Sequence, residues 1–430
     1  MKIALCKSYF AGPVSGADET LVTYAVALRE AGEDVRVVLM YRHTNDDPYY
    51  ERLRKADVPV SCVITHSLAF SILRSLRTFL SSLLFFLFLG PRSPERLRRI
   101  WQVMLNLVSR FHYGECRAYF AAVRPDLLHV FTPDSGAALM IRAGHELGLP
   151  VLYQELGTPH YLPALDVYYR RLEKVLPLCT EVSALSPRLA AQWSERFPFL
   201  NSVTVMPLMV ADGDGHAVTA RRAATCETVF GYAARFEEGK GPLVLIEALT
   251  KLNRERHLGI VRMAGMGPQL LEVKAMTREL GLGDACEFVS HYTEPLGRSA
   301  FMSSLDVFIL PSLAEGTPNG VIEAMAHGLP VIASEVGGIP DLVSEDSGIL
   351  VPPGNDEDLA AAMRRLANDP EQRAKMGAAA RERYLKLFSP DAVLPVLQST
   401  YHRVASKQAS QFTAMRTTGV AHPWEVIAEF

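Results

Sequence analysis

A chain of 430 residues is long enough for two domains, because single hydrophobic cores stop growing at roughly 250–300 residues. Its 49% of hydrophobic and 21% of charged residues are typical of a globular protein with ample core material. The net charge of −3 gives no global reason to expect nucleic-acid binding, and six cysteines without a CxxC pair disfavour a disulfide framework or a zinc site.

The first residues, MKIALC, predict a strand that runs directly into a glycine-rich loop. Because this run has no long apolar region followed by a small-residue cleavage site, we expect no secretory signal. Apolar residues then recur at helical spacing over 19–35, and 35–40 predict the next strand.

Residues 67–118 differ from the rest of the chain, because they hold eight arginines against two glutamates. Within them, residues 78–91 read TFLSSLLFFLFLGP, which is uncharged and shorter than the roughly 20 residues that span a bilayer as a helix. A buried core helix and an interfacial helix docking on anionic lipid are both compatible with this pattern, and a transmembrane span is the least favoured reading.

Short apolar runs at 127–131, 150–156 and 181–186 alternate with helix-like segments such as 135–148. This alternation predicts a parallel sheet covered on both faces. The pattern then lapses into a stretch rich in Gly, Asp, Ala and Thr. We therefore expect a first Rossmann-like domain over 1–207, with 67–118 as an insertion, and a linker over 208–226.

The second half repeats the alternation, with apolar runs at 228–236, 259–265, 286–292, 306–312 and 330–335. A second doubly wound domain is expected over 227–388, and 389–430 form a C-terminal helix and tail predicted to cross back to the first domain. Two α/β domains facing a cleft place ligands at the carboxyl ends of the strands.

Cations follow the first strand of this second half. Arg235 and Lys240 stand five residues apart just beyond it, an arrangement suited to a diphosphate. The alternative is a solvated loop with incidental charges, since Glu237 and Glu238 lie beside them. The next strand ends in AGMGP, a loop for close backbone approach; Leu270 breaks the dinucleotide fingerprint and disfavours a nicotinamide dehydrogenase.

Residues 311–334 place two acids around a turn in a mostly apolar segment. Glu315 is expected at the end of a strand, and Glu323 in the first turn of the following helix, where the helix dipole alone could account for it. Glu315 could equally be a cap or surface acid. Backbone amides at the helix start form an anion site, so cations, amides and acids together could hold a diphosphate and sugar hydroxyls.

The segments GYAARFEEGKG, AGMGP, DVFILPSLAEGTPNGVIEAMAHGLPVIAS and GGIPDLV resemble the donor-domain motifs of glycosyltransferase family four, the retaining GT-B enzymes. The resemblance is dense over about 228–352. It implies that Arg235 and Lys240 neutralise the diphosphate, Glu315 meets the transferred sugar and Glu323 accepts hydrogen bonds from ribose. It also implies close approach of the phosphate and sugar to the amides of Asn319, Gly320 and Val321.

The first half resembles the family more loosely, and the resemblance implies that residues 1–207 form the acceptor-side domain. Gly16 matches the early glycine-rich loop that closes on the donor phosphate, although Ser15 precedes it where Gly is common. Leu156 stands where many members carry a His before a Gly, here Gly157; we consider Glu155, Gln154 or His160 as substitutes, with His160 also explained as an ordinary buried or surface residue. The base is expected near 289–292, where His291 replaces the usual small Gly.

The resemblance thus implies a GT-B fold and a hexosyl- or N-acetylhexosaminyltransferase, with same-face attack and retention at the anomeric carbon. A UDP- or GDP-sugar is the expected co-substrate, no further cofactor or metal is expected, and the acceptor is a glycan or lipid-linked sugar, as in cell-envelope polysaccharide synthesis. We expect a cytoplasmic protein, peripheral on the inner membrane face if 67–118 bind anionic lipid. A nucleotide-sugar epimerase or a non-catalytic nucleotide-sugar binder are the alternatives.

Overall fold

The computed structural model describes residues 1–10, 15–41, 47–64, 112–133, 136–158, 166–200, 202–211, 227–253, 258–289 and 295–418, and every structural statement below concerns these residues. The apolar segment 78–91, His160, His291 and residues 212–226 of the predicted linker lie outside them.

The N-terminal half forms a seven-stranded sheet in the order β3-β2-β1-β4-β5-β6-β7, in which every neighbouring pair is parallel. Its strands β1, β4, β5 and β6 are buried nearly throughout, as expected when helices cover both faces. The strands are β1 (Lys2–Lys7), β2 (Asp34–Tyr41), β3 (Val60–Ile64), β4 (Leu127–Phe131), β5 (Val151–Glu155), β6 (Glu181–Ala184) and β7 (Val203–Val205).

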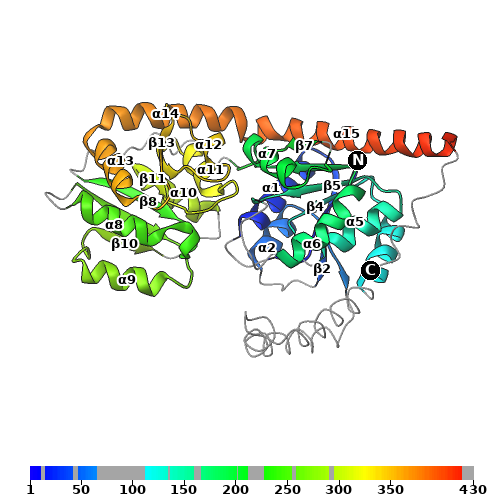
Figure 1. The fold of residues 1–430 in the computed structure, drawn as a ribbon, viewed down its shortest axis with the longest axis horizontal. Helices are drawn as coiled ribbons and strands as arrows, with labels where there is room; N and C mark the ends of the chain where they lie inside the picture. Colours follow the sequence, from blue (N-terminus) through cyan, green and yellow to red (C-terminus); the bar gives the residue numbers. More distant parts are fainter. Residues whose placement is uncertain are drawn as a thin grey trace.

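Helices connect these strands and cover the sheet (Figure 1). They are α1 (Gly16–Glu30), α2 (Pro48–Lys55), a helical segment over 112–123, α5 (Ala137–Glu146), α6 (Asp166–Val175), the 3-10 turn η3 (Leu176–Leu178) and α7 (Pro187–Arg196). Ser15 caps α1 by accepting a hydrogen bond from the Asp18 amide, and Asp47 caps α2 in the same way.

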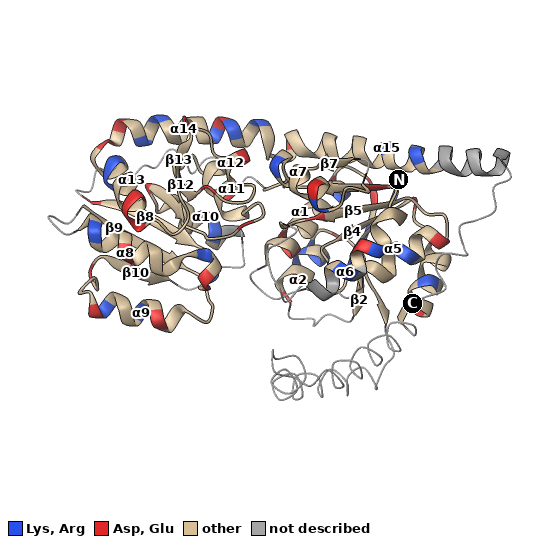
Figure 2. Cartoon of the chain, viewed as in Figure 1, with Lys and Arg blue, Asp and Glu red and all other residues tan. Residues whose placement is uncertain are grey.

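The C-terminal half forms a second, six-stranded parallel sheet in the order β10-β9-β8-β11-β12-β13. The strands are β8 (Thr228–Ala233), β9 (Gly259–Ala264), β10 (Cys286–Val289), β11 (Val307–Leu310), β12 (Val331–Ser334) and β13 (Gly348–Val351). The helical segments are η5 (Glu238–Lys240), α8 (Pro242–Leu252), α9 (Leu270–Glu279), α10 (Pro295–Ser303), α11 (Asn319–Ala326), α12 (Ile339–Leu342), α13 (Asp356–Asn368) and α14 (Pro370–Leu387). The two sheets confirm the predicted pair of doubly wound α/β domains, and charges of both signs lie along the outer helices α9, α13 and α14 (Figure 2).

The last helix, α15 (Pro390–Thr418), returns from the C-terminal half and runs along the N-terminal one, where it contacts α1 and β4 (Figure 1). Val393, Leu397, Tyr401 and Val404 recur every three or four residues and are buried in the core that α1 shares with the first sheet. None of the helices in the described part of the chain is long and apolar enough to cross a membrane.

One predicted helix start is wrong. Helix α11 begins at Asn319, directly after Pro318, whose φ of −78° and ψ of 122° keep the preceding loop extended. Glu323 is therefore the fifth residue of the helix rather than a first-turn residue. Because the dipole effect decays within the first turn, it gives a weaker account of this buried acid than the sequence pattern suggested.

Candidate active site

The order of strands in the second sheet places a crevice at the carboxyl ends of β8 and β11. Chain connections leave these two adjacent strands in opposite directions, and ligands of open α/β sheets bind at such a switch point. The loops that follow β8, β9, β11 and β12 meet at this edge, and they carry the residues predicted for the site.

An ion pair at this edge joins two residues predicted for the site, Lys240 and Glu315. Lys240 Nζ lies 2.6 Å from Glu315 Oε1, and the Ser312 hydroxyl donates to the same oxygen at 2.8 Å. The two charged side chains are 15% and 5% exposed. The pairing fixes both side chains at the crevice, and a negatively charged ligand would compete with Glu315 for the ammonium group.

Arg235 has a different environment. Its guanidinium Nη2 lies 2.9 Å from Glu237 Oε1, and its side chain is half exposed. Tyr232 donates from its hydroxyl to the Arg235 carbonyl at 3.0 Å and so holds the backbone of this loop. Arg235 is thus anchored through its main chain while its side chain faces solvent.

The two glycines of AGMGP pack directly against the loop that follows β8. Gly265 and Gly267 have φ values of 145° and 155°, and a Cβ on either would lie 2.0 and 2.4 Å from the carbonyl oxygens of Ala234 and Phe236. Phe236 also donates from its amide to the Met266 carbonyl at 2.9 Å. The close backbone approach predicted from the sequence is therefore made by the loop that carries Arg235.

The start of α11 exposes backbone donors to the crevice. Val321 donates its amide to the Pro318 carbonyl at 3.2 Å, whereas the amides of Asn319 and Gly320 face no acceptor within the described residues. A Cβ at Gly320 would lie 3.3 Å from the Ala233 carbonyl, so α11 begins directly against the end of β8. Of the three predicted amides, two remain available for an anion.

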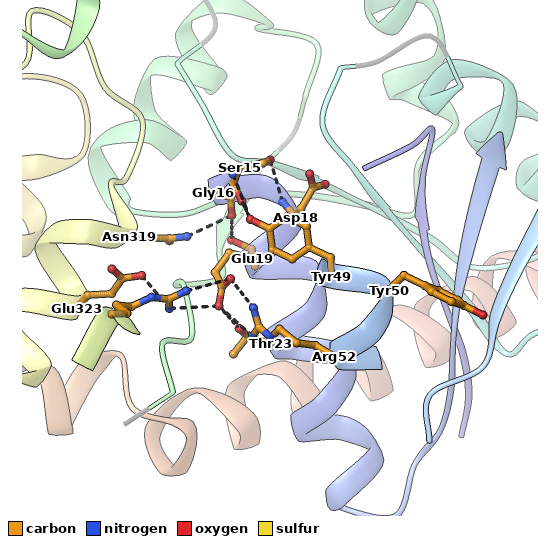
Figure 3. Close-up of polar contacts among 12 residues, drawn as sticks. Ser15, Gly16, Asp18, Glu19, Thr23, Tyr49, Tyr50, Arg52, Asn319 and Glu323 are labelled. Carbon is orange, nitrogen blue, oxygen red and sulfur yellow. Dashed lines mark hydrogen bonds and ion pairs between the residues drawn. The ribbon is translucent and has the colours of Figure 1, made fainter. Parts of the chain in front are cut away.

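Two contacts bring the first domain to this edge. The Asn319 side chain donates through Nδ2 to the Gly16 carbonyl at 3.2 Å (Figure 3). On the other side, a Cβ at Gly316 would lie 2.4 Å from the Leu156 carbonyl oxygen and 2.9 Å from the Gly157 Cα. Gly16 and Gly157, predicted from the looser resemblance, therefore both lie opposite the donor-side loops.

Glu323 lies in α11 and is only 7% exposed. Its Oε1 forms an ion pair with Arg298 Nη1 of α10 at 3.0 Å, and Arg298 also reaches Glu19 of α1 at 3.3 Å. Burial raises the pKa of Glu323; Arg298 opposes this rise, and the negative charge of Glu19 adds to it.

Several site residues were not identified from the sequence. Arg298 and Glu19 were missed because neither belongs to a motif that sequence spacing reveals. Lys7, at the end of β1, forms a buried ion pair with Asp18 in the first turn of α1. In the sequence, this pair is indicated only by the position of Lys7 at the end of an apolar strand.

Glu155 is one of the residues that the sequence offers in place of the missing histidine. The structure gives its carboxylate three defined hydrogen bonds. Its carboxylate accepts hydrogen bonds from the Tyr153 hydroxyl at 2.6 Å and from the amides of Leu156 and Gly157 at 3.0 and 2.9 Å. Burial raises its pKa to about 7, although these three hydrogen bonds each lower it. Glu155 thus shapes the backbone turn that meets Gly316.

Comparisons with known proteins relate the second half of the chain to a known family. Residues 220–383 match the family model described as Glycosyl transferases group 1, and they include every donor-side residue discussed above. Residues 220–383 are thus similar to this family, and they make up less than half of the chain.

Curated relatives align with the chain over part of their length. The MMP alpha-(1->4)-mannosyltransferase of Mycolicibacterium hassiacum is 29% identical over 173 residues, 40% of this chain and 42% of the relative. The lipopolysaccharide core biosynthesis glycosyltransferase LpsD of Rhizobium meliloti is 32% identical over 175 residues, 40% of this chain and 49% of the relative. The chain therefore matches less than half the length of these relatives.

The similarity of fold extends over nearly the whole chain. HepE from Anabaena, solved in complex with UDP, superposes with a TM-score of 0.67 at 17% identity, covering 94% of this chain and all of HepE. The two facing doubly wound domains are thus a GT-B fold, as expected from the sequence. No group of three or more metal-ligand side chains that could hold an ion lies within the described residues.

Proposed function

We propose that this protein transfers a hexosyl or N-acetylhexosaminyl residue from a UDP- or GDP-sugar to a glycan or lipid-linked acceptor, with retention at the anomeric carbon. The observation that carries the proposal is the crevice at β8 and β11, where Lys240, Glu315 and the free amides of α11 converge. The UDP bound to HepE, a protein of the same fold, supports a nucleotide-diphosphate donor.

In the proposed reaction the bond between the anomeric carbon and the donor phosphate oxygen breaks while the acceptor oxygen bonds to the same face of that carbon. The acceptor proton passes to the departing phosphate oxygen, and the diphosphate leaves with its charge. Lys240 and Arg235, together with the amides of Asn319 and Gly320, stabilise that developing charge without a metal ion. Glu315 then contacts the transferred sugar, and Glu323 accepts hydrogen bonds from ribose.

In the structure Lys240 is paired with Glu315, so donor binding must change the partner of its ammonium group. A diphosphate oxygen entering the crevice takes over the ammonium group from Glu315, and this leaves the Glu315 carboxylate to accept hydrogen bonds from sugar hydroxyls. Ser312 keeps that carboxylate in place through its 2.8 Å hydrogen bond. Exchange of partners therefore links donor binding to the exposure of the sugar-binding acid.

The relative LpsD acts in lipopolysaccharide core biosynthesis, which supports a cell-envelope acceptor for the present chain. The eight arginines of 67–118 and the apolar run 78–91 favour an acceptor presented at the inner face of the cytoplasmic membrane. We propose that the protein is cytoplasmic and binds that surface peripherally.

Substitution of Lys240 tests the proposed function. For Lys240→Gln we expect the turnover of whichever UDP- or GDP-sugar stabilises the wild-type protein to fall about a hundred- to a thousandfold, since removing one donor to the developing charge costs about 2.7–4 kcal/mol. Sugar transfer is measured by chromatography of the released nucleotide and the glycosylated acceptor.

Lys251→Gln provides the matched control, because Lys251 lies in the same domain in ion pairs with Asp356 and Glu357 at 2.8 and 2.9 Å, away from the crevice. It should retain wild-type turnover. Unchanged turnover in Lys240→Gln would contradict the assignment. A new nucleotide sugar formed without acceptor would indicate an epimerase instead, and donor binding without transfer to any acceptor would indicate a binding protein.

A further inference from the structure

Four charged side chains form an alternating chain across the two domains (Figure 3). Arg52 of α2 and Glu19 of α1 belong to the first domain, and Arg298 of α10 and Glu323 of α11 belong to the second. The four side chains are 9–17% exposed, so solvent screens their interactions only weakly. Their charges sum to zero, and each cation lies next to an anion.

The first-domain end of this chain is rigidly held. Arg52 donates to both carboxylate oxygens of Glu19, through Nη1 to Oε2 at 2.6 Å and through Nη2 to Oε1 at 3.0 Å. Burial favours the neutral form of Glu19, but Arg298 and Arg52 outweigh it and lower the pKa of Glu19 to about 2. Glu19 is therefore a fixed negative charge that can hold Arg298 from the opposite domain.

At the other end, Glu323 has one direct charged partner among the described residues. Arg298 Nη1 binds its Oε1 at 3.0 Å. An ionised carboxylate has about four lone-pair sites on its two oxygens, so one contact with Arg298 leaves sites that can accept hydrogen bonds from hydroxyl groups. The contact with Arg298 is compatible with ligand binding.

The surrounding charges leave Arg298 as the main influence that keeps Glu323 ionised. Arg52 adds a weaker favourable charge and Glu19 an unfavourable one. On α11 itself, the ring of His327 lies between two oxygens, with Nδ1 2.7 Å from the Glu323 backbone carbonyl oxygen and Nε2 3.2 Å from Ser299 Oγ. From α14, Arg381 donates to the backbone carbonyl of Ala326.

We propose that Arg298 is a positioning residue that keeps the Glu323 carboxylate charged and oriented toward the donor hydroxyls, and that Glu19 makes this depend on the approach of the two domains. The inference rests on the proposed role of Glu323 in binding ribose. Because Glu19 and Glu323 share one guanidinium across the cleft, donor binding and domain approach stabilise each other.

The test compares the binding of UDP and GDP over a range of pH by isothermal titration calorimetry. Wild-type affinity should change less than threefold between pH 8 and pH 6. In Arg298→Gln, Glu323 loses the cation that lowers its pKa, so the pKa rises further and we expect affinity at pH 6 to be at least fivefold weaker than at pH 8. Arg298→Lys should restore most of the wild-type profile.

Two further variants separate this effect from general damage. Arg298→Gln combined with Glu323→Gln should bind weakly but without the added pH dependence, because the titrating group is gone. Arg262→Gln is the matched control, since Arg262 is 17% exposed and pairs with Glu287 at 2.6 Å in the same domain; it should retain the wild-type profile. A loss of affinity that is equal at all pH values in Arg298→Gln would overturn the inference and indicate a merely structural role.

A ligand-free measurement makes the test independent of the nucleotide. In Arg298→Gln the buried Glu323 lacks its cation, so its pKa rises and its charged form, which burial disfavours, is more populated at pH 8 than at pH 5. Its melting temperature relative to the double variant should therefore be lower at pH 8 than at pH 5. An identical difference at both pH values would overturn the inference.

The two proposals can fail separately. If Glu323→Gln leaves nucleotide affinity unchanged, or if wild-type protein binds neither UDP nor GDP, the proposed ribose contact fails whatever the melting temperatures show. If Glu323→Gln weakens binding but neither pH effect appears in Arg298→Gln, the ribose contact stands and the role of Arg298 is wrong.

Discussion

At the scale of single residues, the site depends on carboxylates kept in unusual surroundings. Glu315 has a lysine 2.6 Å away and Glu323 an arginine 3.0 Å away, whereas Glu155 receives only neutral donors and is 2% exposed. A buried acid without a cation is expected to retain its proton to higher pH, which accounts for the raised pKa of Glu155.

Glu155→Gln should change the pH dependence of stability. The pKa of Glu155 is raised from 4.5 to about 7 on folding, so its contribution to stability is complete below pH 4.5 and is lost as pH rises to about 7. Glutamine is neutral throughout, and its carbonyl oxygen still accepts from the amides of Leu156 and Gly157. The free energy of unfolding of wild type relative to the variant should therefore fall by about 3 kcal/mol between pH 4.5 and pH 7.5, measured by urea denaturation. A pH-independent difference would contradict the assignment.

At the scale of elements, glycines let the loops at the sheet edge lie against one another. Gly337, after β12, has a φ of 55°, and a Cβ there would lie 1.8 Å from the Glu315 carbonyl oxygen. Gly338 donates its amide to the Gly316 carbonyl at 2.8 Å. The GGIP motif thus packs against the backbone of the loop that carries Glu315 and stabilises it.

Gly337→Ala should destabilise the protein by more than the roughly 1–2 kcal/mol of left-handed strain alone, because the new methyl group also displaces the Glu315 backbone. Donor affinity should weaken at the same time. The control is Gly32→Ala: its φ is 86° but a Cβ meets nothing within 4 Å, so only the strain remains and donor affinity should not change. Equal effects of the two substitutions on both measurements would show that the support of Glu315 is unimportant.

At the scale of the whole molecule, α15 makes the first domain dependent on the end of the chain. Tyr401 is buried in the first core, and its hydroxyl lies 2.8 Å from His129 Nδ1 in β4. The other ring nitrogen of His129 has no hydrogen-bond partner within the described residues. Contacts over 272 positions of sequence thus complete the core of the N-terminal half.

Tyr401→Phe should lower the free energy of unfolding by about 1–3 kcal/mol, because it leaves a second buried nitrogen of His129 without a partner. Tyr401→Ala should cost about 3–5 kcal/mol, as it also opens a cavity. Val396→Ala on the same helix, where Val396 is 38% exposed, should change stability by less than about 0.5 kcal/mol. Urea denaturation measures all three, and a loss in Val396→Ala as large as that in Tyr401→Phe would refute a specific role for the tyrosine.

Local patterns in the sequence were sufficient for the strand and helix alternation and for the family motifs over 228–352. Short, continuous apolar runs that alternate with helices predict a parallel sheet, because the strands of such a sheet are buried on both faces. The motif residues Lys240, Glu315 and Glu323 follow adjacent strands, and the strand order places all three at one edge of the sheet. Helix α11 began two residues before the predicted start because Pro318 ends the extended loop earlier than the apolar pattern suggests. The domain boundaries and the site roles remain predictions.

The sequence by itself thus determined the architecture, since the alternation of strands and helices depends on spacing within short segments. Only the tertiary structure decided which charges meet. Lys240 and Glu315 are 75 positions apart, and Glu19 and Arg298 are 279 positions apart. Side chains so distant in sequence become neighbours only when the sheets are assembled and the domains face each other, and ion pairing depends on that final distance and on burial.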